Sequence, residues 1–116
     1  MSYDLAVWEG TRPNTNAEAG KTFEALMAQE EGEKSPEPTP AIRRYVEALL
    51  AKYPQLDDDN EDECPWADSP LIGNASGPIF YFAMVYSHAE RASAFAAKLA
   101  NRHGLVCFDP QLSELR

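Results

Sequence analysis

The sequence predicts an α+β domain built on a four-stranded, mostly antiparallel sheet. The first observation is a strand, an amphipathic helix and a second strand that follow one another between residues 78 and 110. The second is a short strand at the amino terminus, which two helical segments separate from a predicted edge strand. With 116 residues the chain can build one hydrophobic core, so we expect residues 1–116 to form a single domain.

The clearest element is the run of apolar and aromatic residues over 79–86, whose length and β-favouring side chains predict a buried strand. Ser87 and Glu90 have the spacing of a capping box, so we expect a helix to begin there. Apolar residues then recur at three- and four-residue steps until Gly104, which is suited to end a helix. Residues 105–108 are apolar again and predict a second strand.

Three further elements are expected before this unit. Residues 3–8 alternate roughly between two faces and predict the first strand. A helix is predicted over residues 17–29, after several residues that can cap its amino terminus. Thr39 and Pro40 are a hydroxyl cap and a proline at the first helical position, so a second helix is expected from there to Pro54.

The remaining segments indicate loops and one edge strand. Residues 30–38 are polar and contain prolines, so we expect an exposed linker. Residues 66–72 predict a short strand, and Pro70 within it predicts a position at the sheet edge. Residues 73–78 are expected to form a turn, and residues 111–116 a tail.

These elements fit an arrangement similar to the ferredoxin-like fold, in which the helices pack on one face of a four-stranded sheet. In that layout the strand over residues 3–8 lies between the strands over 79–86 and 105–108.

The formal net charge is −9, and one segment supplies most of it. Residues 57–68 contain seven acidic residues and no basic one, which leaves a net charge of −2 for the rest of the chain. Because nucleic acids and anionic membranes are bound through Lys and Arg, this composition argues against both as partners. It favours a basic protein partner for the acidic loop over residues 57–64.

Further sequence features bear on the compartment. No stretch reaches the roughly 18 apolar residues needed to span a bilayer. The amino terminus lacks the basic and apolar segments of a secretory signal, and two cysteines do not make a disulfide framework. We therefore expect a cytoplasmic protein.

The acidic loop has several interpretations. A calcium site of the EF-hand type needs glycine at its sixth position, and frames that begin at Asp57 or Asp58 do not supply it. We therefore expect no metal and no cofactor, and the loop is either a solvated segment or a docking surface. Trp66 is either an aromatic anchor beside the acids or a core residue beneath them. For a docking surface we predict these partner-binding residues: Asp57, Asp58, Asp59, Glu61, Asp62, Glu63, Trp66 and Asp68.

The residue types that commonly carry catalysis are not grouped in the sequence. Cys64 lies among negative charges, which disfavour the thiolate, and Cys107 lies within a predicted buried strand. His88 and His103 are about 22 Å apart along one predicted helix, so they cannot share a site. Residues 73–77 lack the ending of a phosphate-binding loop. We therefore expect no catalytic residues and no enzymatic activity.

Three segments carry a resemblance: Tyr3–Trp8, Pro70–Gly77 and Gly104–Gln111. They resemble a group of small, acidic, cytoplasmic bacterial proteins that open with a Tyr-Asp-Leu strand and close with a Gly-Leu-Val-x-Tyr/Phe-Asp-Pro-Gln strand. In size and acidity such proteins are similar to the immunity proteins of polymorphic-toxin systems, which bind and neutralise a cognate toxin domain. The resemblance implies a basic toxin domain as the partner.

Two other functions stay open. A small ligand-binding domain or enzyme would use a pocket between sheet and helices. A deep cleft that holds His88 or His103 against a carboxylate would favour this function. The candidates for lining that pocket are Tyr3, Tyr45, Tyr81 or Tyr86. A structural subunit would self-associate, for example as a homodimer through the sheet face or the edge at Pro70.

Overall fold

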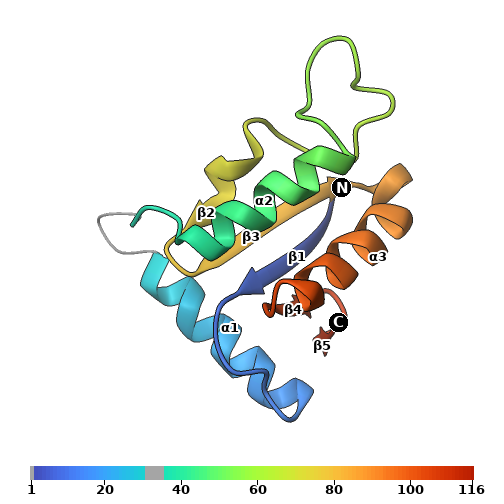
Figure 1. Cartoon of the computed structure of the whole chain (residues 1–116). Coiled ribbons are helices and arrows are strands. Elements are labelled where there is room, and N and C mark those ends of the chain that lie inside the picture. The colour runs from blue at the N-terminus through green and yellow to red at the C-terminus, as the bar shows by residue number, and fades with distance from the viewer. Residues whose placement is uncertain (1, 31–35) are drawn as a thin grey trace.

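The computed structural model describes residues 2–30 and 36–116 and confirms an α+β domain with an antiparallel sheet (Figure 1). In this part of the chain the sheet has five strands, in the spatial order β2-β3-β1-β4-β5. The strands are β1 (Ser2–Trp8), β2 (Ala75–Ser76), β3 (Ile79–Val85), β4 (Val106–Asp109) and β5 (Glu114–Leu115). The helices are α1 (Asn16–Glu30), α2 (Pro40–Lys52) and α3 (Tyr86–Arg102), with a short 3-10 helix, η1, at Leu71–Asn74.

β1 is the central strand, between β3 and β4, as the sequence predicts. It pairs along its whole length with β3, so that Ser2 lies opposite Val85 and Trp8 opposite Ile79. Its second half also pairs with β4. Hydrogen bonds on both edges hold this strand in place although it begins at the second residue of the chain.

Helices cover both faces of the sheet, which corrects the prediction that they lie on one face. Leu5 and Val7 of β1 belong to the core beneath α2 and α3, whereas Ala6 and Trp8 belong to a second core with α1. Because both faces carry apolar side chains, each needs a cover. The four-stranded, ferredoxin-like arrangement is therefore not confirmed. In the described part of the chain helices cover the sheet faces, and the homodimer through the edge at Pro70 stays a prediction.

The two short outer strands differ from the prediction. β5 lies within residues 111–116, which were expected to be a tail, and β2 lies within the predicted turn over residues 73–78. The predicted edge strand over 66–72 is wrong, since only Trp66 of that segment forms a bridge, to Met84. Two-residue strands carry no periodicity of their own, so tertiary contacts decide where they form.

Two of the three long helices begin as the local sequence indicates. Thr39 caps α2, and its hydroxyl accepts a hydrogen bond from the Ile42 amide at 3.3 Å. Thr15 does the same for α1, where its hydroxyl accepts from the Glu18 amide at 3.1 Å.

The predicted capping box at Ser87 and Glu90 is wrong. α3 begins one residue earlier, at Tyr86, and Val85 precedes it without a side-chain cap. Val85 still belongs to the sheet, where its amide donates to the Pro65 carbonyl at 2.7 Å. The strand therefore passes directly into the helix, and no residue is left between them to act as a polar cap.

The expected linker over residues 30–38 is only partly described. Residue 30 ends α1, and residues 31–35 lie outside the described residues. Pro36 is exposed, but its carbonyl accepts a hydrogen bond from Gly77 at 3.0 Å. Thr39 in turn donates to the Gly77 carbonyl at 3.0 Å. The end of this segment is therefore fixed against the turn before β3.

The carboxyl-terminal strands are held by the buried carboxylate of Asp109. Tyr3 donates its hydroxyl to one oxygen of this carboxylate, and Arg116 forms an ion pair with the same oxygen at 3.5 Å. The other oxygen accepts from the amides of Gln111 at 2.9 Å and Leu112 at 3.2 Å, and from the Gln111 side chain. A fully buried charge needs such partners, because an unpaired one would cost several kcal/mol.

Gln111 connects the hydrogen bonds around Asp109 to the central strand β1. Its side-chain amide donates to the Asp4 carbonyl at 2.7 Å and accepts from the Asp4 amide at 2.6 Å. The side chain therefore pairs with β1 much as the backbone of a neighbouring strand would. These residues belong to the segments that carry the resemblance, and the structure gives them a structural role.

Removing the Asp109 carboxylate should destabilise the protein strongly. We expect Asp109→Ala to lower the free energy of unfolding by about 3 kcal/mol, because four hydrogen bonds and one ion pair lose their acceptor. Asp58→Ala, which removes an exposed carboxylate, should change it by less than about 0.5 kcal/mol. Urea unfolding monitored by tryptophan fluorescence measures both, and equal stabilities would contradict the role of Asp109.

Candidate functional site

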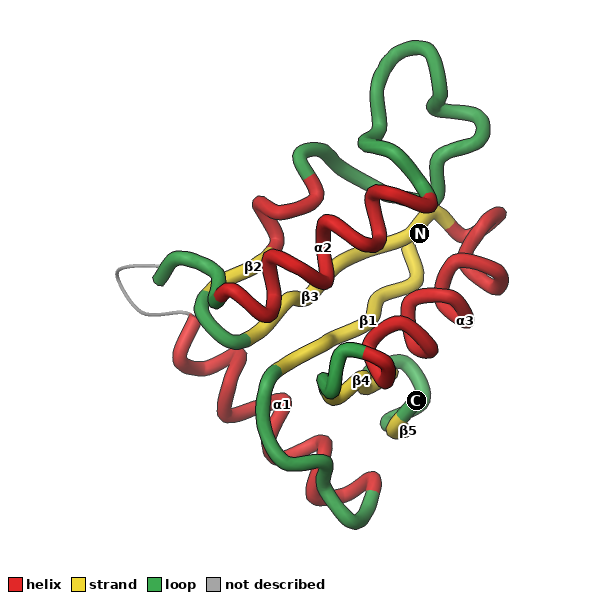
Figure 2. Tube along the Cα trace, in the orientation of Figure 1, coloured by secondary structure: helices red, strands yellow, loops and turns green. Residues whose placement is uncertain are grey.

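The acidic loop has a defined backbone and extends away from the body of the fold between α2 and η1 (Figure 2). One carboxylate oxygen of Asp57 accepts hydrogen bonds from the amides of Asp59 at 2.8 Å and Asn60 at 2.9 Å. The side-chain oxygen of Asn60 accepts a hydrogen bond from the Asp57 amide at 2.8 Å, and its side-chain nitrogen donates to the Gln55 carbonyl at 2.7 Å. The turn therefore holds its shape through its own side chains.

The carboxylates of this loop are exposed and form no ion pair with any residue that the structure describes. Among the described residues the structure has a single ion pair, between Arg116 and Asp109, which lies outside the loop. Only Asp57 uses its carboxylate to hold the loop. The remaining acids accept no side-chain hydrogen bond within the described chain, and they are Asp58, Asp59, Glu61, Asp62 and Glu63.

Trp66 does not belong to this surface. Its side chain is fully buried, and the indole N–H donates to the Tyr53 carbonyl at 2.7 Å. The ring packs edge-on against Tyr53 and Phe82. Of the two interpretations of Trp66, the structure shows the core residue, and we remove it from the predicted partner-binding set. Asp68 is exposed and accepts a hydrogen bond from Asn74 at 2.9 Å.

Tyr86, the first residue of α3, is an exposed aromatic residue. Its side chain is 58% exposed and packs edge-on against Tyr3 at 6.2 Å between ring centroids. Two residues later, the His88 ring nitrogen lies 2.8 Å from the Asp62 carbonyl and so joins α3 to the loop. The exposure of Tyr86 differs from the predicted buried strand over residues 79–86, because Tyr86 ends an unbroken apolar run.

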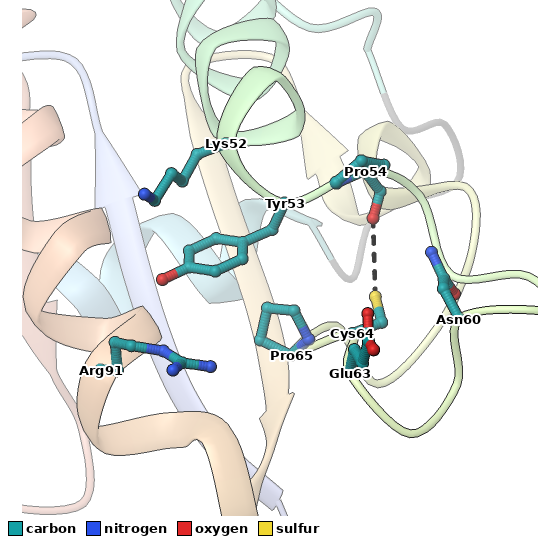
Figure 3. A pocket seen from close by; sticks show the side chains of 8 residues that line it. All are labelled: Lys52, Tyr53, Pro54, Asn60, Glu63, Cys64, Pro65 and Arg91. Atoms are coloured by element: carbon teal, nitrogen blue, oxygen red, sulfur yellow. Dashed lines mark hydrogen bonds between the residues drawn. The ribbon is translucent and has the colours of Figure 1, made fainter.

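A groove lies at the base of the loop, between the end of α2 and the start of α3 (Figure 3). Its volume is about 520 Å³. The residues that line it are Lys52, Tyr53, Pro54, Asn60, Glu63, Cys64, Pro65 and Arg91. The groove therefore shares three residues with the loop segment, from Asn60 to Cys64.

Cys64 is placed as a structural residue. The thiol is buried and donates to the Pro54 carbonyl at 3.5 Å. Burial raises the pKa of the Cys64 thiol, and the charge of Asp57 adds to the rise. Burial likewise raises the pKa of Cys107 to about 12. The prediction that the thiolate of Cys64 is disfavoured is therefore confirmed, although burial raises the pKa more than the neighbouring negative charges do.

The two histidines lie at opposite ends of α3. His88 contacts a loop carbonyl, and His103 packs edge-on against Tyr45 at 5.9 Å between ring centroids. In the described residues no carboxylate side chain forms a hydrogen bond or ion pair with either ring. The histidine–carboxylate pair that would favour an enzyme is therefore not seen among the described residues.

The four tyrosines of the ligand-pocket hypothesis do not line one pocket. Tyr45 is buried and donates to the Ala96 carbonyl at 2.7 Å. Tyr81 lies on the α1 side of the sheet, where its hydroxyl donates to Asp4 at 2.9 Å. Only Tyr3 and Tyr86 share a surface groove. Of the four candidates, Tyr3 and Tyr86 are therefore the pair that a shared groove brings together.

The described residues contain neither a metal-ligand cluster nor a helix able to span a membrane. Within residues 2–30 and 36–116 no group of three or more His, Cys, Asp or Glu residues is placed to hold a metal ion. Over the same residues no helix combines the length and apolar character that crossing a bilayer requires.

Comparison with known proteins found no matching family model, no matching curated protein and no matching solved structure. The function of this chain must therefore be argued from its own geometry.

The stability of the protein should fall at alkaline pH. Burial and a carboxylate partner raise the pKa of both Tyr3 and Tyr81 from 10.0 to about 12. Between these pH values the unfolded chain loses phenol protons that the folded chain keeps, so the free energy of unfolding decreases as pH rises. We expect the melting temperature to drop across this range, and less steeply in Tyr3→Phe or Tyr81→Phe. Parallel slopes for wild type and both variants would contradict the assignment.

Loss of the His88 contact should loosen the acidic loop. We expect His88→Ala to speed amide hydrogen exchange in residues 57–63 by about fivefold, the effect of one hydrogen bond worth about 1 kcal/mol. His103→Ala is the matched control, because it removes a ring from the far end of the same helix. Exchange mass spectrometry measures both variants. If both variants speed amide exchange in residues 57–63 equally, the His88 contact does not hold the loop.

Proposed function

We propose that this chain is an immunity-type binding protein that captures a basic toxin domain in the bacterial cytoplasm and neutralises it. The observation that carries the proposal is a loop with five exposed carboxylates that lack a cationic partner within the described chain. Gathering like charges in one place raises the free energy of the unbound protein. A basic surface on another protein would relieve this repulsion, and the relief would favour the complex.

The loop also suits binding because its backbone is already shaped. Asp57 and Asn60 fix the turn, and the His88 contact joins it to α3. A pre-shaped loop loses less conformational entropy when it binds than a flexible segment would. Its charges would mainly accelerate encounter with a basic partner.

Neutralising the loop should slow association with the partner. The test variant carries Asp58→Asn, Asp59→Asn, Glu61→Gln, Asp62→Asn and Glu63→Gln, and keeps Asp57, whose carboxylate holds the turn. We expect its association rate at low salt to fall by about tenfold or more, with a weaker dependence on salt.

The matched control neutralises the same number of exposed acids outside the loop, so that both variants have the same net charge. Its substitutions are Glu9→Gln, Glu24→Gln, Glu37→Gln, Glu47→Gln and Glu114→Gln. The partner is first captured at low salt on the immobilised wild-type chain and then purified for rate measurements. Equal rates for both variants, or a captured partner that does not inhibit growth when expressed alone, would refute the proposal.

A further inference from the structure

The groove at the base of the acidic loop has two ends of opposite charge. In Figure 3 the Lys52 ammonium, the Tyr53 hydroxyl and the Arg91 guanidinium lie toward one side, and Glu63 lies toward the other. The first two come from the end of α2 and the residue after it, and Arg91 comes from α3. Pro65 and the Tyr53 ring lie between the ends and provide an apolar floor.

The donors at the cationic end form no hydrogen bond or ion pair with the described residues. Lys52 lies 5.9 Å from the centre of the Tyr53 ring, and neither Lys52 nor Arg91 forms an ion pair in the described chain. The Tyr53 hydroxyl likewise forms no hydrogen bond with the described residues, unlike the hydroxyls of Tyr3, Tyr45 and Tyr81. Two cations and a hydroxyl line this end of the groove, which makes it a site for an anionic group, and a carboxylate fits their donors.

We propose that this groove binds an extended segment of the partner that carries an Asp or Glu next to basic residues. The carboxylate would lie against Lys52, Tyr53 and Arg91, and a neighbouring Lys or Arg would lie against Glu63. The inference rests on the proposed function and deepens it, because it describes the surface that the partner must present. The occupant is a protein segment because the groove continues into the acidic loop through residues 60–64.

The cationic end would make the protein selective. A uniformly basic surface would be attracted by the loop but repelled by Lys52 and Arg91. A basic surface with one acid at the right place would satisfy both regions. Specificity of this kind needs a repulsive element against wrong partners as well as an attractive one for the right partner.

The test compares the binding of two blocked peptides, acetyl-Lys-Ala-Asp-Ala-Lys-amide and acetyl-Lys-Ala-Asn-Ala-Lys-amide. Carboxylate binding in the groove and simple charge attraction predict opposite orders of affinity for them. They differ only in one carboxylate, and the Asn peptide carries the higher positive charge. Simple attraction to an acidic protein would therefore favour the Asn peptide. If the groove takes a carboxylate, the Asp peptide binds at least threefold more tightly, and the NMR signals of Tyr53, Cys64 and Arg91 shift on titration into the full chain.

Matched variants assign the preference to the groove. Lys52→Gln with Arg91→Gln should abolish the preference for the Asp peptide, whereas Arg43→Gln with Arg44→Gln, which removes two exposed cations from α2, should keep it. An equal or tighter fit of the Asn peptide, or no shift of groove signals with either peptide, would overturn the inference. Acetate that competes as well as the Asp peptide would assign the groove to a small anion and overturn it too.

The inference and the proposed function can fail separately. If the peptides show no preference while neutralising the loop still slows capture of the partner, only the groove assignment is wrong. If neutralising the loop has no effect, the proposed function itself is wrong.

Discussion

The constraint on which the sheet depends is the burial of the Asp109 carboxylate. A charge that is fully removed from water must be met by donors, and here the donors come from β1, from the turn after β4 and from Arg116. Meeting that need brings the end of the chain back as β5 and lets Gln111 pair with the backbone of β1. The polar side chains that look most distinctive in the sequence therefore serve the fold.

The same end of β1, where Ser2 pairs with Val85, also presents a contrasting use of charge. Near the start of α3 the acidic loop keeps its carboxylates in solvent and without an ion pair in the described chain, while a small polar network fixes its backbone. Beside it the groove holds Lys52 and Arg91, also without an ion pair. The proposed partner would supply opposite charges to these groups. Within the described chain, the ion pair that the fold itself forms is the one between Arg116 and Asp109.

Much of the fold could be predicted from local sequence. The apolar run of β3, the cap of α2 at Thr39 and the amphipathic pattern of α3 each depend on residues close together in the chain. The central position of β1 was also predicted correctly, since sheets place short terminal strands where neighbours can hold them. Of the candidate site, the sequence identified the exposed acids of the loop.

The sequence by itself determined the fold class, the order of the main elements and the place of the negative charge, because these follow from composition and short-range periodicity. Only the tertiary structure decided that α1 covers the second face of the sheet, that Trp66 lies in the core and that Tyr86 is exposed. It alone brought Lys52 and Arg91 to one groove. Each of these depends on contacts between residues far apart in the chain, and no local pattern encodes such contacts.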